Sequence, residues 1–329
     1  MKTQTLFGRR AFAAACAVAL LCGSSAWAQT KLKWAHVYEA TESYHKQALW
    51  AADEVKRQTA GRVLIDVFPS SQLGKETEIN QGLTMGTVDI IYTGMAFAGR
   101  TLPALSLSSA PFVFRDHAHW QAFRASPLWR ELANQYEAKS GGNQIVGYTY
   151  YGLRHMTSNK PITKPEDMKG LKLRVPDAPI FMMFPKAVGA NPTPIAFAEV
   201  YLALQNGTVD AQENPLPTIE AKKFYEVQKY ITLTGHITES LVTIVSGLAW
   251  QRLSAEDRKI VEAVLWDAST RASAEILDAE NKLADEFVKR GKIVNKVDRA
   301  PFAAAVRGPM TAADAPWSRE LFEKVQALK

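Results

Sequence analysis

The sequence predicts an α/β protein built from two similar lobes. The tetrapeptide GTVD occurs at residues 86–89 and again at 207–210, and earlier matches extend the shared pattern to E-[IV]-x-x-x-L-x-x-G-T-V-D. Strands and helices are predicted to alternate ahead of each copy, an order typical of a parallel sheet covered by helices. Repeats of about 20–50 residues would indicate a solenoid. A single recurrence after 121 residues indicates two lobes of the same design.

Residues 1–28 are predicted to form a secretory signal peptide. Basic residues at positions 2, 9 and 10 precede an apolar run from Ala11 to Leu21, and Ala26-Trp27-Ala28 supplies an A-x-A cleavage site. The apolar run is shorter than the roughly 20 residues of a membrane-spanning helix. We therefore expect cleavage after Ala28 and a periplasmic protein, exported by either the general or the twin-arginine route.

Residues 29–150 are expected to form mainly the first lobe. Thr41 is the predicted N-cap of a helix that Gly61 ends, and Gly86 of the repeat ends the next helix. The predicted elements, in order, are strand 31–37, helix 41–61, strand 62–68, helix 75–85 and strand 88–92.

Residues 151–240 are expected to form mainly the second lobe. The predicted strands are 144–151, 171–175 and 211–214, with a helix at 197–205 that ends at the second GTVD. In open α/β sheets ligands bind beyond the carboxyl ends of the strands. We therefore expect the residues around Thr93-Gly94 and around Asn214 to face each other across a cleft.

Residues 241–329 are expected to hold a crossover strand, a long helix and further C-terminal helices. Helical character runs from Ser254 to about Arg290, so this segment either braces both lobes or breaks between Ala268 and Ser273. A short strand at 292–297 and a last helix at 317–328 complete the chain.

Composition excludes several classes of function. Both cysteines, Cys16 and Cys22, lie in the predicted signal peptide, so we expect no disulfide and no thiolate chemistry in the rest of the chain. Residues 29–329 carry a net charge of +3 with scattered basic residues, which does not suit nucleic-acid binding. No catalytic, metal-binding or cofactor-binding motif occurs, and no later apolar run suggests a membrane-embedded protein.

The pattern alone gives little weight to any one polar residue. In GLKLRVP, Arg174 shares a strand face with Lys172, opposite three apolar side chains, and a solvated strand residue is the plain interpretation. Arg154 is no more distinctive. Asn214 precedes a proline, which favours an extended backbone at a strand end.

Longer motifs resemble one family. FPSSQLGKETEINQGLTMGTVD, GLRHMTSNKPITKPEDMKGLKLRVPDAP and GANPTPIAFAEVYLALQNGTVDAQENPL are similar to the solute-binding proteins of TRAP transporters, the DctP family, and the similarity covers nearly all of residues 29–329. The resemblance implies a two-lobed, hinge-closing periplasmic-binding-protein fold (type II-like, Venus flytrap) with one long helix bracing both lobes. It also implies a sodium-coupled membrane permease as partner, a small organic acid as ligand, and no catalysis.

The resemblance also implies ligand-binding residues. Arg174 matches the family's arginine that pairs with the ligand carboxylate, and Arg154 matches a second arginine of the cleft. Asn214 matches an amide that reaches the ligand, Phe197 an aromatic residue packed near it, and Glu76 an acidic position after SQLG. A helix-start hydrophobic contact for Phe197 and a first-turn acid for Glu76 remain as alternatives.

Other positions bear on the choice of ligand. Gly94 stands where sialic-acid-binding members carry a glutamate, which argues against sialic acid. Thr93 lies at the predicted cleft, and His36 and Glu39 follow the first strand at its carboxyl end. If Glu39 faced the cleft rather than solvent, it would accept hydrogen bonds from hydroxyls and repel a second carboxylate. One carboxylate with several hydroxyls describes a sugar acid, and the chain resembles the uronate-binding members of the family. The resemblance therefore implies a hexuronate such as galacturonate or glucuronate.

Alternatives to a hexuronate carrier remain open. Within the same role, the ligand could be a C4-dicarboxylate, a 2-oxo acid or an aromatic acid. In other classes, the chain could be an exported hydrolase or lyase of sugar acids, or a ligand-loaded partner of a sensor domain. No set of nucleophile, base and orienting group supports the enzyme.

Overall fold

One continuous mixed sheet runs through both lobes. The computed structural model describes residues 29–329, so the predicted signal peptide and its cleavage after Ala28 lie outside the described residues. The strands are β1 (Thr30–Ala35), β2 (Val63–Phe68), β3 (Ile90–Gly94), β4 (Gln144–Ser158), β5 (Lys172–Val175), β6 (Asn191–Pro194), β7 (Ala211–Pro215), β8 (Tyr230–Val245) and β9 (Ile293–Lys296). Their order is β2-β1-β3-β8-β4-β7-β5-β6, with β9 paired to β8.

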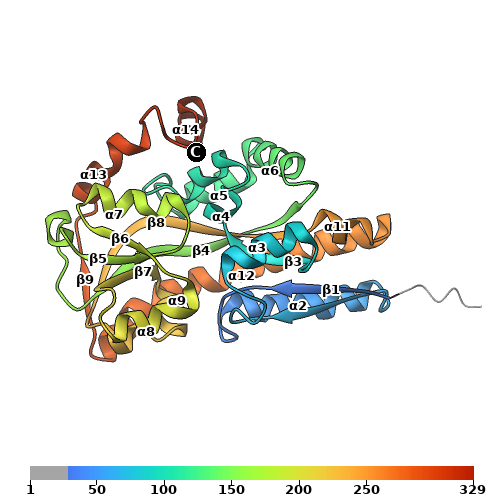
Figure 1. Cartoon of the computed structure of the whole chain (residues 1–329), viewed down its shortest axis with the longest axis horizontal. Coiled ribbons are helices and arrows are strands. Elements are labelled where there is room, and N and C mark those ends of the chain that lie inside the picture. The colour runs from blue at the N-terminus through green and yellow to red at the C-terminus, as the bar shows by residue number, and fades with distance from the viewer. Residues whose placement is uncertain (1–28) are drawn as a thin grey trace, which may run out of the picture.

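Helices pack against the sheet along both lobes (Figure 1). The α-helices are α2 (Ser43–Gln58), α3 (Glu76–Met85), α4 (Met95–Ala98), α5 (His117–Ala125), α6 (Pro127–Lys139), α7 (Met183–Ala187), α8 (Val200–Gln205), α9 (Leu216–Ala221), α10 (Phe224–Val227), α11 (Gly247–Gln251), α12 (Ala255–Lys289), α13 (Ala300–Met310) and α14 (Arg319–Gln326). The 3-10 helices in the described part of the chain are η1 (Pro103–Ser109), η2 (Pro165–Met168), η3 (Pro179–Met182) and η4 (Phe197–Glu199). Within residues 29–329, no helix is both long and apolar enough to cross a bilayer.

The two GTVD copies play the same structural part in the two lobes. Gly86 and Gly207 adopt left-handed φ angles of 75° and 74°, which end the preceding helix at no Cβ cost. The aspartate of each copy then clamps the adjacent parallel strand. The carboxylate of Asp89 accepts the N–H of Lys33 at 2.8 Å, and that of Asp210 accepts the N–H of Lys172 at 2.9 Å. The repeat is thus a helix stop joined to a strand clamp, used once per lobe.

Strands β4 and β8 belong to both lobes. They pair antiparallel from Gln144 opposite Val245 to Ser158 opposite Tyr230. At one end of this long pair β8 meets β3 of the first lobe, and at the other end β4 meets β7 of the second lobe. The crossover strand therefore begins at Tyr230, inside the range expected for the second lobe. The ladder shifts register between Tyr150 and Gly152, near the middle of the pair.

The long helix α12 is continuous and braces both lobes. It packs on α2 of the first lobe, on the shared strand β4 and on α9 of the second lobe. The alternative of a break between Ala268 and Ser273 is wrong, because Ala268, Ser269, Ala272 and Ser273 lie buried in the packed face of the helix. Their small side chains let the helix approach the sheet closely: a Cβ added at Gly147 would lie 3.2 Å from the Cβ of Ser269.

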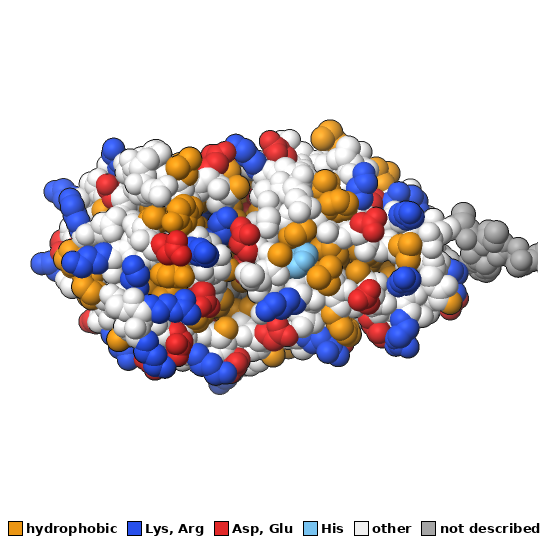
Figure 2. Space-filling view, turned by 90° about the horizontal axis from the view of Figure 1, so that it is seen from below, with side chains coloured by type: hydrophobic (Ala, Val, Ile, Leu, Met, Phe, Trp, Pro, Cys, Tyr) orange, Lys and Arg blue, Asp and Glu red, His pale blue; other side chains and the backbone are white. Residues whose placement is uncertain are grey.

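Most predicted elements match the structure to within two residues at each end. The N-cap of α2 is Glu42 rather than Thr41, and its carboxylate accepts the N–H of Glu39 at 2.8 Å instead of capping the helix. On the molecular face shown in Figure 2, basic and acidic side chains are interspersed, with apolar side chains between them.

Candidate ligand-binding site

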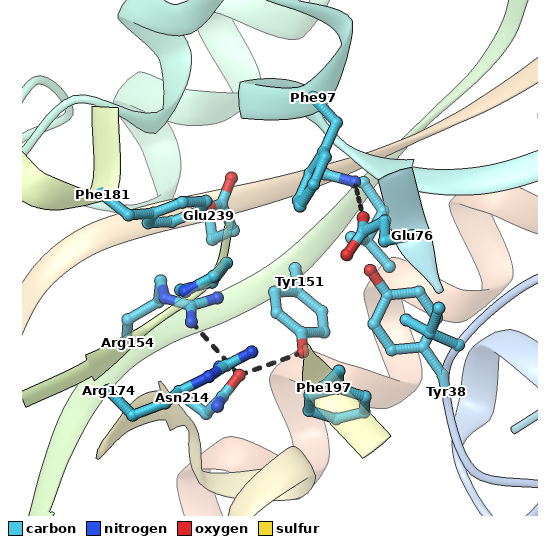
Figure 3. Close-up of a pocket in the computed structure, with 14 residues that line it drawn as sticks. Tyr38, Glu76, Phe97, Tyr151, Arg154, Arg174, Phe181, Phe197, Asn214 and Glu239 are labelled. Carbon is cyan, nitrogen blue, oxygen red and sulfur yellow. Dashed lines mark hydrogen bonds between the residues drawn. The ribbon is translucent and has the colours of Figure 1, made fainter. Parts of the chain in front are cut away.

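A pocket lies between the lobes, next to the shared strands (Figure 3). Gly94 at the end of β3 and Asn214 in β7 both line it, which confirms that the segments after the two GTVD copies face each other. The first lobe supplies Tyr38, Glu76 and Phe97, the second supplies Arg174, Phe181 and Phe197, and the shared strands supply Tyr151, Arg154, Glu239 and Leu241.

Arg174 presents a free nitrogen to this pocket. It lies near the carboxyl end of β5 and is 2% exposed, so the solvated-strand interpretation is wrong. Nε and Nη2 donate to the carbonyl of Ile195 at 2.9 and 2.7 Å, whereas the buried Nη1 has no partner among residues 29–329. Burial lowers the pKa of Arg174 to about 10, so the group stays charged near neutral pH. A fixed, charged guanidinium with one free nitrogen suits a carboxylate ligand.

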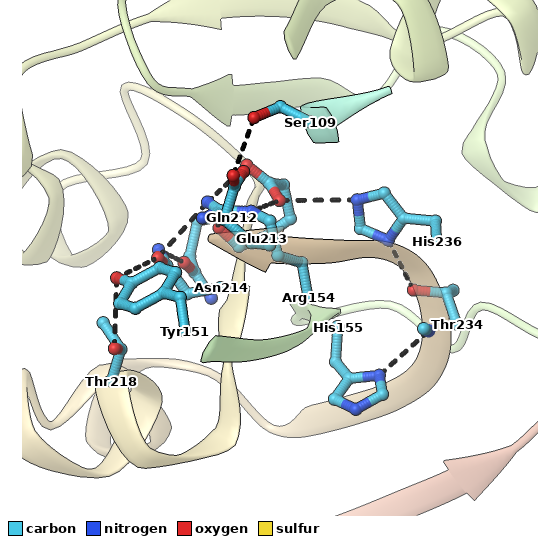
Figure 4. A network of polar contacts seen from close by, with 12 residues as sticks. Ser109, Tyr151, Arg154, His155, Gln212, Glu213, Asn214, Thr218, Thr234 and His236 are labelled. Carbon is cyan, nitrogen blue, oxygen red and sulfur yellow. Dashed lines mark hydrogen bonds and ion pairs between the residues drawn. The ribbon is translucent and has the colours of Figure 1, made fainter. Parts of the chain in front are cut away.

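Arg154 is held by a buried ion pair with Glu213 (Figure 4). Nε and Nη2 of Arg154 both contact the carboxylate, and Nη2 also donates to the carbonyl of Glu213 at 2.8 Å. The two side chains are 3% and 2% exposed. Burial disfavours the charge on Arg154, but the Glu213 carboxylate outweighs burial and raises the pKa of Arg154. Nη1 makes no hydrogen bond within the described chain and is left for the pocket.

Two buried histidines complete the network behind Arg154. His236 Nε2 lies 3.4 Å from the carboxylate of Glu213, and His236 Nδ1 lies 2.8 Å from the hydroxyl of Thr234. His155 Nδ1 accepts the N–H of Gly235 at 3.0 Å. Burial lowers the pKa of His236 and lowers that of His155 to about 3, so both rings are neutral at pH 7. The negative charge of Glu213 is therefore balanced by Arg154 and not by the histidines.

Asn214 and the aromatic residues shape the wall. The Asn214 side-chain oxygen accepts from Arg154 Nη2 at 3.2 Å and from the Tyr151 hydroxyl at 3.3 Å, which fixes the orientation of the amide. Phe197 begins η4 and is 8% exposed. Its ring lies 6.0 Å from the guanidinium carbon of Arg174 and 6.0 Å from the Tyr38 ring centroid. Phe197 therefore both starts a helix with a hydrophobic contact and forms part of the pocket wall, so the two interpretations of this residue are compatible.

Glu76 brings a carboxylate into the pocket. One oxygen accepts the N–H of Gly94 at 2.8 Å and the hydroxyl of Thr93 at 3.0 Å. The other oxygen makes no hydrogen bond among the described residues. Burial raises the pKa of Glu76, while the two donors and the nearby arginines oppose the shift. Glu76 is the first residue of α3, so the first-turn position and the pocket position are also compatible.

Three predicted residues do not reach the pocket wall. Thr93 acts behind Glu76 through its hydroxyl. His36 is 1% exposed and contacts the ring of His45 at 3.2 Å, and burial lowers its pKa to about 3. Glu39 forms an ion pair with Lys222 at 2.7 Å, which joins the two lobes. Glu39 is therefore neither a free loop acid nor a residue that lines the pocket.

Glu239 was missed by the sequence reasoning. It lies in β8, is 1% exposed and lines the pocket. The sequence signal is the run of three polar residues Thr238-Glu239-Ser240 in the segment ITESLVTIV, whose other residues are apolar except Thr243. Nothing in that pattern shows which face of a doubly buried strand meets a cavity.

The lobes are closed around the pocket. Its cavity of about 30 Å³ holds about two water molecules. A second cavity of about 250 Å³, also lined by Glu76, Arg174 and Phe197, lies on the outer side. Two ion pairs link the lobes beside it, Lys75 with Glu199 at 2.6 Å and Arg100 with Asp177 at 3.4 Å. A ligand larger than a few atoms therefore requires the walls to move apart before it enters.

Comparisons with known proteins agree with this architecture. The model of the family "bacterial extracellular solute-binding protein, family 7" matches residues 34–313. The sialic acid-binding periplasmic protein SiaP of Vibrio cholerae is 33% identical over 309 residues, which cover 94% of this chain and 96% of that protein.

Solved structures show the same fold. A TRAP periplasmic solute-binding protein from a Polaromonas species, bound to D-erythronate, has a TM-score of 0.87 and 34% identity, covering 92% of this chain and 99% of that one. A homologue from Xanthobacter autotrophicus with β-D-galacturonate has a TM-score of 0.85 and 28% identity, with coverage of 91% and 100%. The predicted two-lobed fold with a bracing helix is confirmed. The chain belongs to family 7 of the bacterial extracellular solute-binding proteins, the non-enzymatic periplasmic components of TRAP transporters that bind small organic acids.

Proposed function

We propose that the organic acid bound by this protein is a hexuronate, such as galacturonate or glucuronate, and that the loaded protein delivers it to a TRAP membrane permease. One observation carries the proposal: the buried, partnerless Nη1 of Arg174 shares a pocket with the free carboxylate oxygen of Glu76. The first group suits a ligand carboxylate, and the second suits a ligand hydroxyl.

The surrounding residues support a polar ligand with an apolar carbon skeleton. Arg154 supplements Arg174 at the carboxylate, and the Asn214 amide sets orientation. The rings of Phe97, Phe181 and Phe197 offer apolar faces for the carbon skeleton. The ligands bound by two related proteins, β-D-galacturonate and D-erythronate, each carry one carboxylate together with several hydroxyls.

The residue at position 94 has less influence on the ligand than the sequence alone suggests. A Cβ added at Gly94 would lie 3.7 Å from Glu76 Oε1, so the carboxylate of Glu76 already occupies the neighbouring space. A hydroxyl acceptor is therefore present there despite the glycine. Sialic acid stays among the ligands to test, together with C4-dicarboxylates, 2-oxo acids and aromatic acids.

A thermal-shift screen of residues 29–329 tests the ligand class. The panel is galacturonate, glucuronate, sialic acid, succinate, malate, pyruvate and mandelate, with neutral galactose as control. A ligand at 100 times its Kd stabilises the folded state by about 2.7 kcal/mol, a readily measured shift. A shift with uronates supports the proposal, whereas a shift confined to dicarboxylates, 2-oxo acids or aromatic acids rejects the hexuronate.

Arg174→Ala tests the site assignment. We expect at least a tenfold loss of affinity with the fold retained, because the variant removes the charged partner of the carboxylate. Lys172→Ala is the matched control, since Lys172 lies two residues earlier in β5 but is exposed. Equal affinities for the acid in Arg174→Ala and wild type, measured by calorimetry, would reject the assignment.

Export is also part of the proposal. We propose that the signal peptide is removed after Ala28, so that the exported protein begins at Gln29. The intact mass of the protein from a periplasmic extract checks this boundary, and any other N-terminus contradicts it.

A further inference from the structure

Two residues of the pocket wall carry a buried polar atom with no partner among residues 29–329. They are Arg174, through Nη1, and Glu239, through Oε2. Buried polar groups are nearly always hydrogen-bonded, so each exception calls for a cause. The two atoms have opposite chemistry: the guanidinium nitrogen donates, and the carboxylate oxygen accepts.

The side chain of Glu239 is fixed by its other oxygen. Oε1 accepts the hydroxyl of Ser109 in η1 at 2.7 Å and the N–H of Ser240 at 3.0 Å. Oε1 is satisfied from two directions, so in the ionised form Oε2 is the oxygen left to accept a hydrogen bond. Arg154 lines the same cavity, yet no ion pair within the described chain joins Arg154 to Glu239.

Three titratable groups on β4 and β7 interact with the carboxyl of Glu239. Arg154 of β4 stabilises the ionised carboxylate of Glu239, and Glu213 of β7 destabilises it. The Tyr148 hydroxyl of β4 also lies near this carboxyl, next to Ser108 of η1. Burial outweighs the attraction by Arg154 and raises the pKa of Glu239 to about 7. A hydrogen-bond donor placed at Oε2 would favour the ionised form and lower this pKa, whereas a second carboxylate would raise it further.

We propose that Glu239 is a specificity-determining residue whose Oε2 accepts a hydrogen bond from a hydroxyl group of the ligand. This inference rests on the proposed binding of an organic acid, and it deepens that proposal by naming the second group that the ligand must carry. A hydroxy acid satisfies Arg174 with its carboxylate and Glu239 with a hydroxyl. Succinate offers no donor and places a second negative charge near Glu239.

Calorimetry with a matched set of ligands and variants tests the role of Glu239. The probes are galacturonate, D-erythronate and succinate, titrated into residues 29–329 as wild type and as Glu239→Gln. We expect Glu239→Gln to lower the affinity for galacturonate and D-erythronate at least tenfold, and to leave the affinity for succinate unchanged or higher. If the variant instead lowers the affinity for all three probes by the same factor, the effect is a general loss of stability and the proposal is overturned.

Proton linkage supplies a second readout. Binding of galacturonate or D-erythronate to the wild type near pH 7 should release protons, because the hydroxyl lowers the pKa of Glu239. Titrations in buffers of different ionisation enthalpy measure this release, which should vanish in Glu239→Gln. Proton release that persists unchanged in the variant contradicts the assignment.

A further variant covers failure to fold. Glu239→Asp keeps the charge but withdraws the carboxylate by one methylene. The affinity for hydroxy acids should therefore fall at least threefold, and the affinity for succinate should not rise. If wild type binds a hydroxy acid and both variants bind it equally well, the inference on Glu239 fails while the proposed function stands. If wild type binds none of the three probes, the hexuronate proposal fails first and takes this inference with it.

Discussion

The buried pair of Arg154 and Glu213 gives the sharpest test of the network behind the pocket. Glu213→Gln keeps the size and shape of the side chain but removes its charge. The two side chains are 3% and 2% exposed, so water does not replace the missing carboxylate. Breaking a buried pair by neutralising one partner costs about 3–5 kcal/mol, because the other charge is left uncompensated. His236 cannot replace the lost carboxylate, because an imidazole ring is either neutral or positively charged.

That loss corresponds to a fall in Tm of about 6–10 °C, at roughly 2 °C per kcal/mol for a chain of this length. Differential scanning calorimetry of wild type and variant, without added acid, measures it. Asp278→Asn is the control, since the Asp278–Lys282 pair is 66% and 67% exposed and surface changes stay within about 0.5 kcal/mol. A fall below about 2 °C in Glu213→Gln would refute the reasoning, because it would mean that Arg154 does not depend on that charge.

Two further predictions concern the lobe contacts and the brace. Glu42 of the first lobe accepts the hydroxyl of Thr218 in the second lobe at 2.9 Å. Burial raises the pKa of Glu42 from 4.5 to about 7, so its contribution to stability is fully present below pH 4.5 and is lost as the pH rises through 7. Urea unfolding at pH 5 and pH 8 should therefore show wild type gaining up to about 3 kcal/mol relative to Glu42→Gln at the lower pH, and an equal difference at both pH values would contradict this. In Gly147→Ala the new Cβ would lie 2.7 Å from the hydroxyl of Thr243 and 3.2 Å from the Cβ of Ser269. Overpacking of this kind lowers the free energy of unfolding by about 1–3 kcal/mol, which thermal unfolding measures. An unchanged Tm would contradict this prediction and show that α12 moves away from β4 without loss of stability.

Local sequence patterns predict the elements of this fold because each depends on nearby residues. The helix stops at Gly86 and Gly207 need only a left-handed φ, and both were predicted from the repeat. The family resemblance placed Arg174 in the pocket, which the strand pattern alone did not. Glu39 shows the limit of both approaches: its partner Lys222 lies 183 residues away in the other lobe, and no local pattern reveals that contact.

Glu239 shows a second limit. A strand buried on both faces has no polar side to indicate its orientation, so a single acid within it gives no direction. Only the three-dimensional arrangement of Ser109, β8 and the pocket shows that one carboxylate oxygen is fixed and the other is free.

The shared strands place two residues of the pocket on the backbone that connects the lobes. Arg154 and Glu239 lie on β4 and β8, beside the register shifts that interrupt the ladder between the lobes. If the two halves of the sheet bend relative to each other there, both side chains move with the backbone that carries them. Ligand affinity and the angle between the lobes would then depend on each other at these positions. In that case a substitution of Arg154 or Glu239 that changes affinity would also change the angle between the lobes, and capture and release would depend on the same residues.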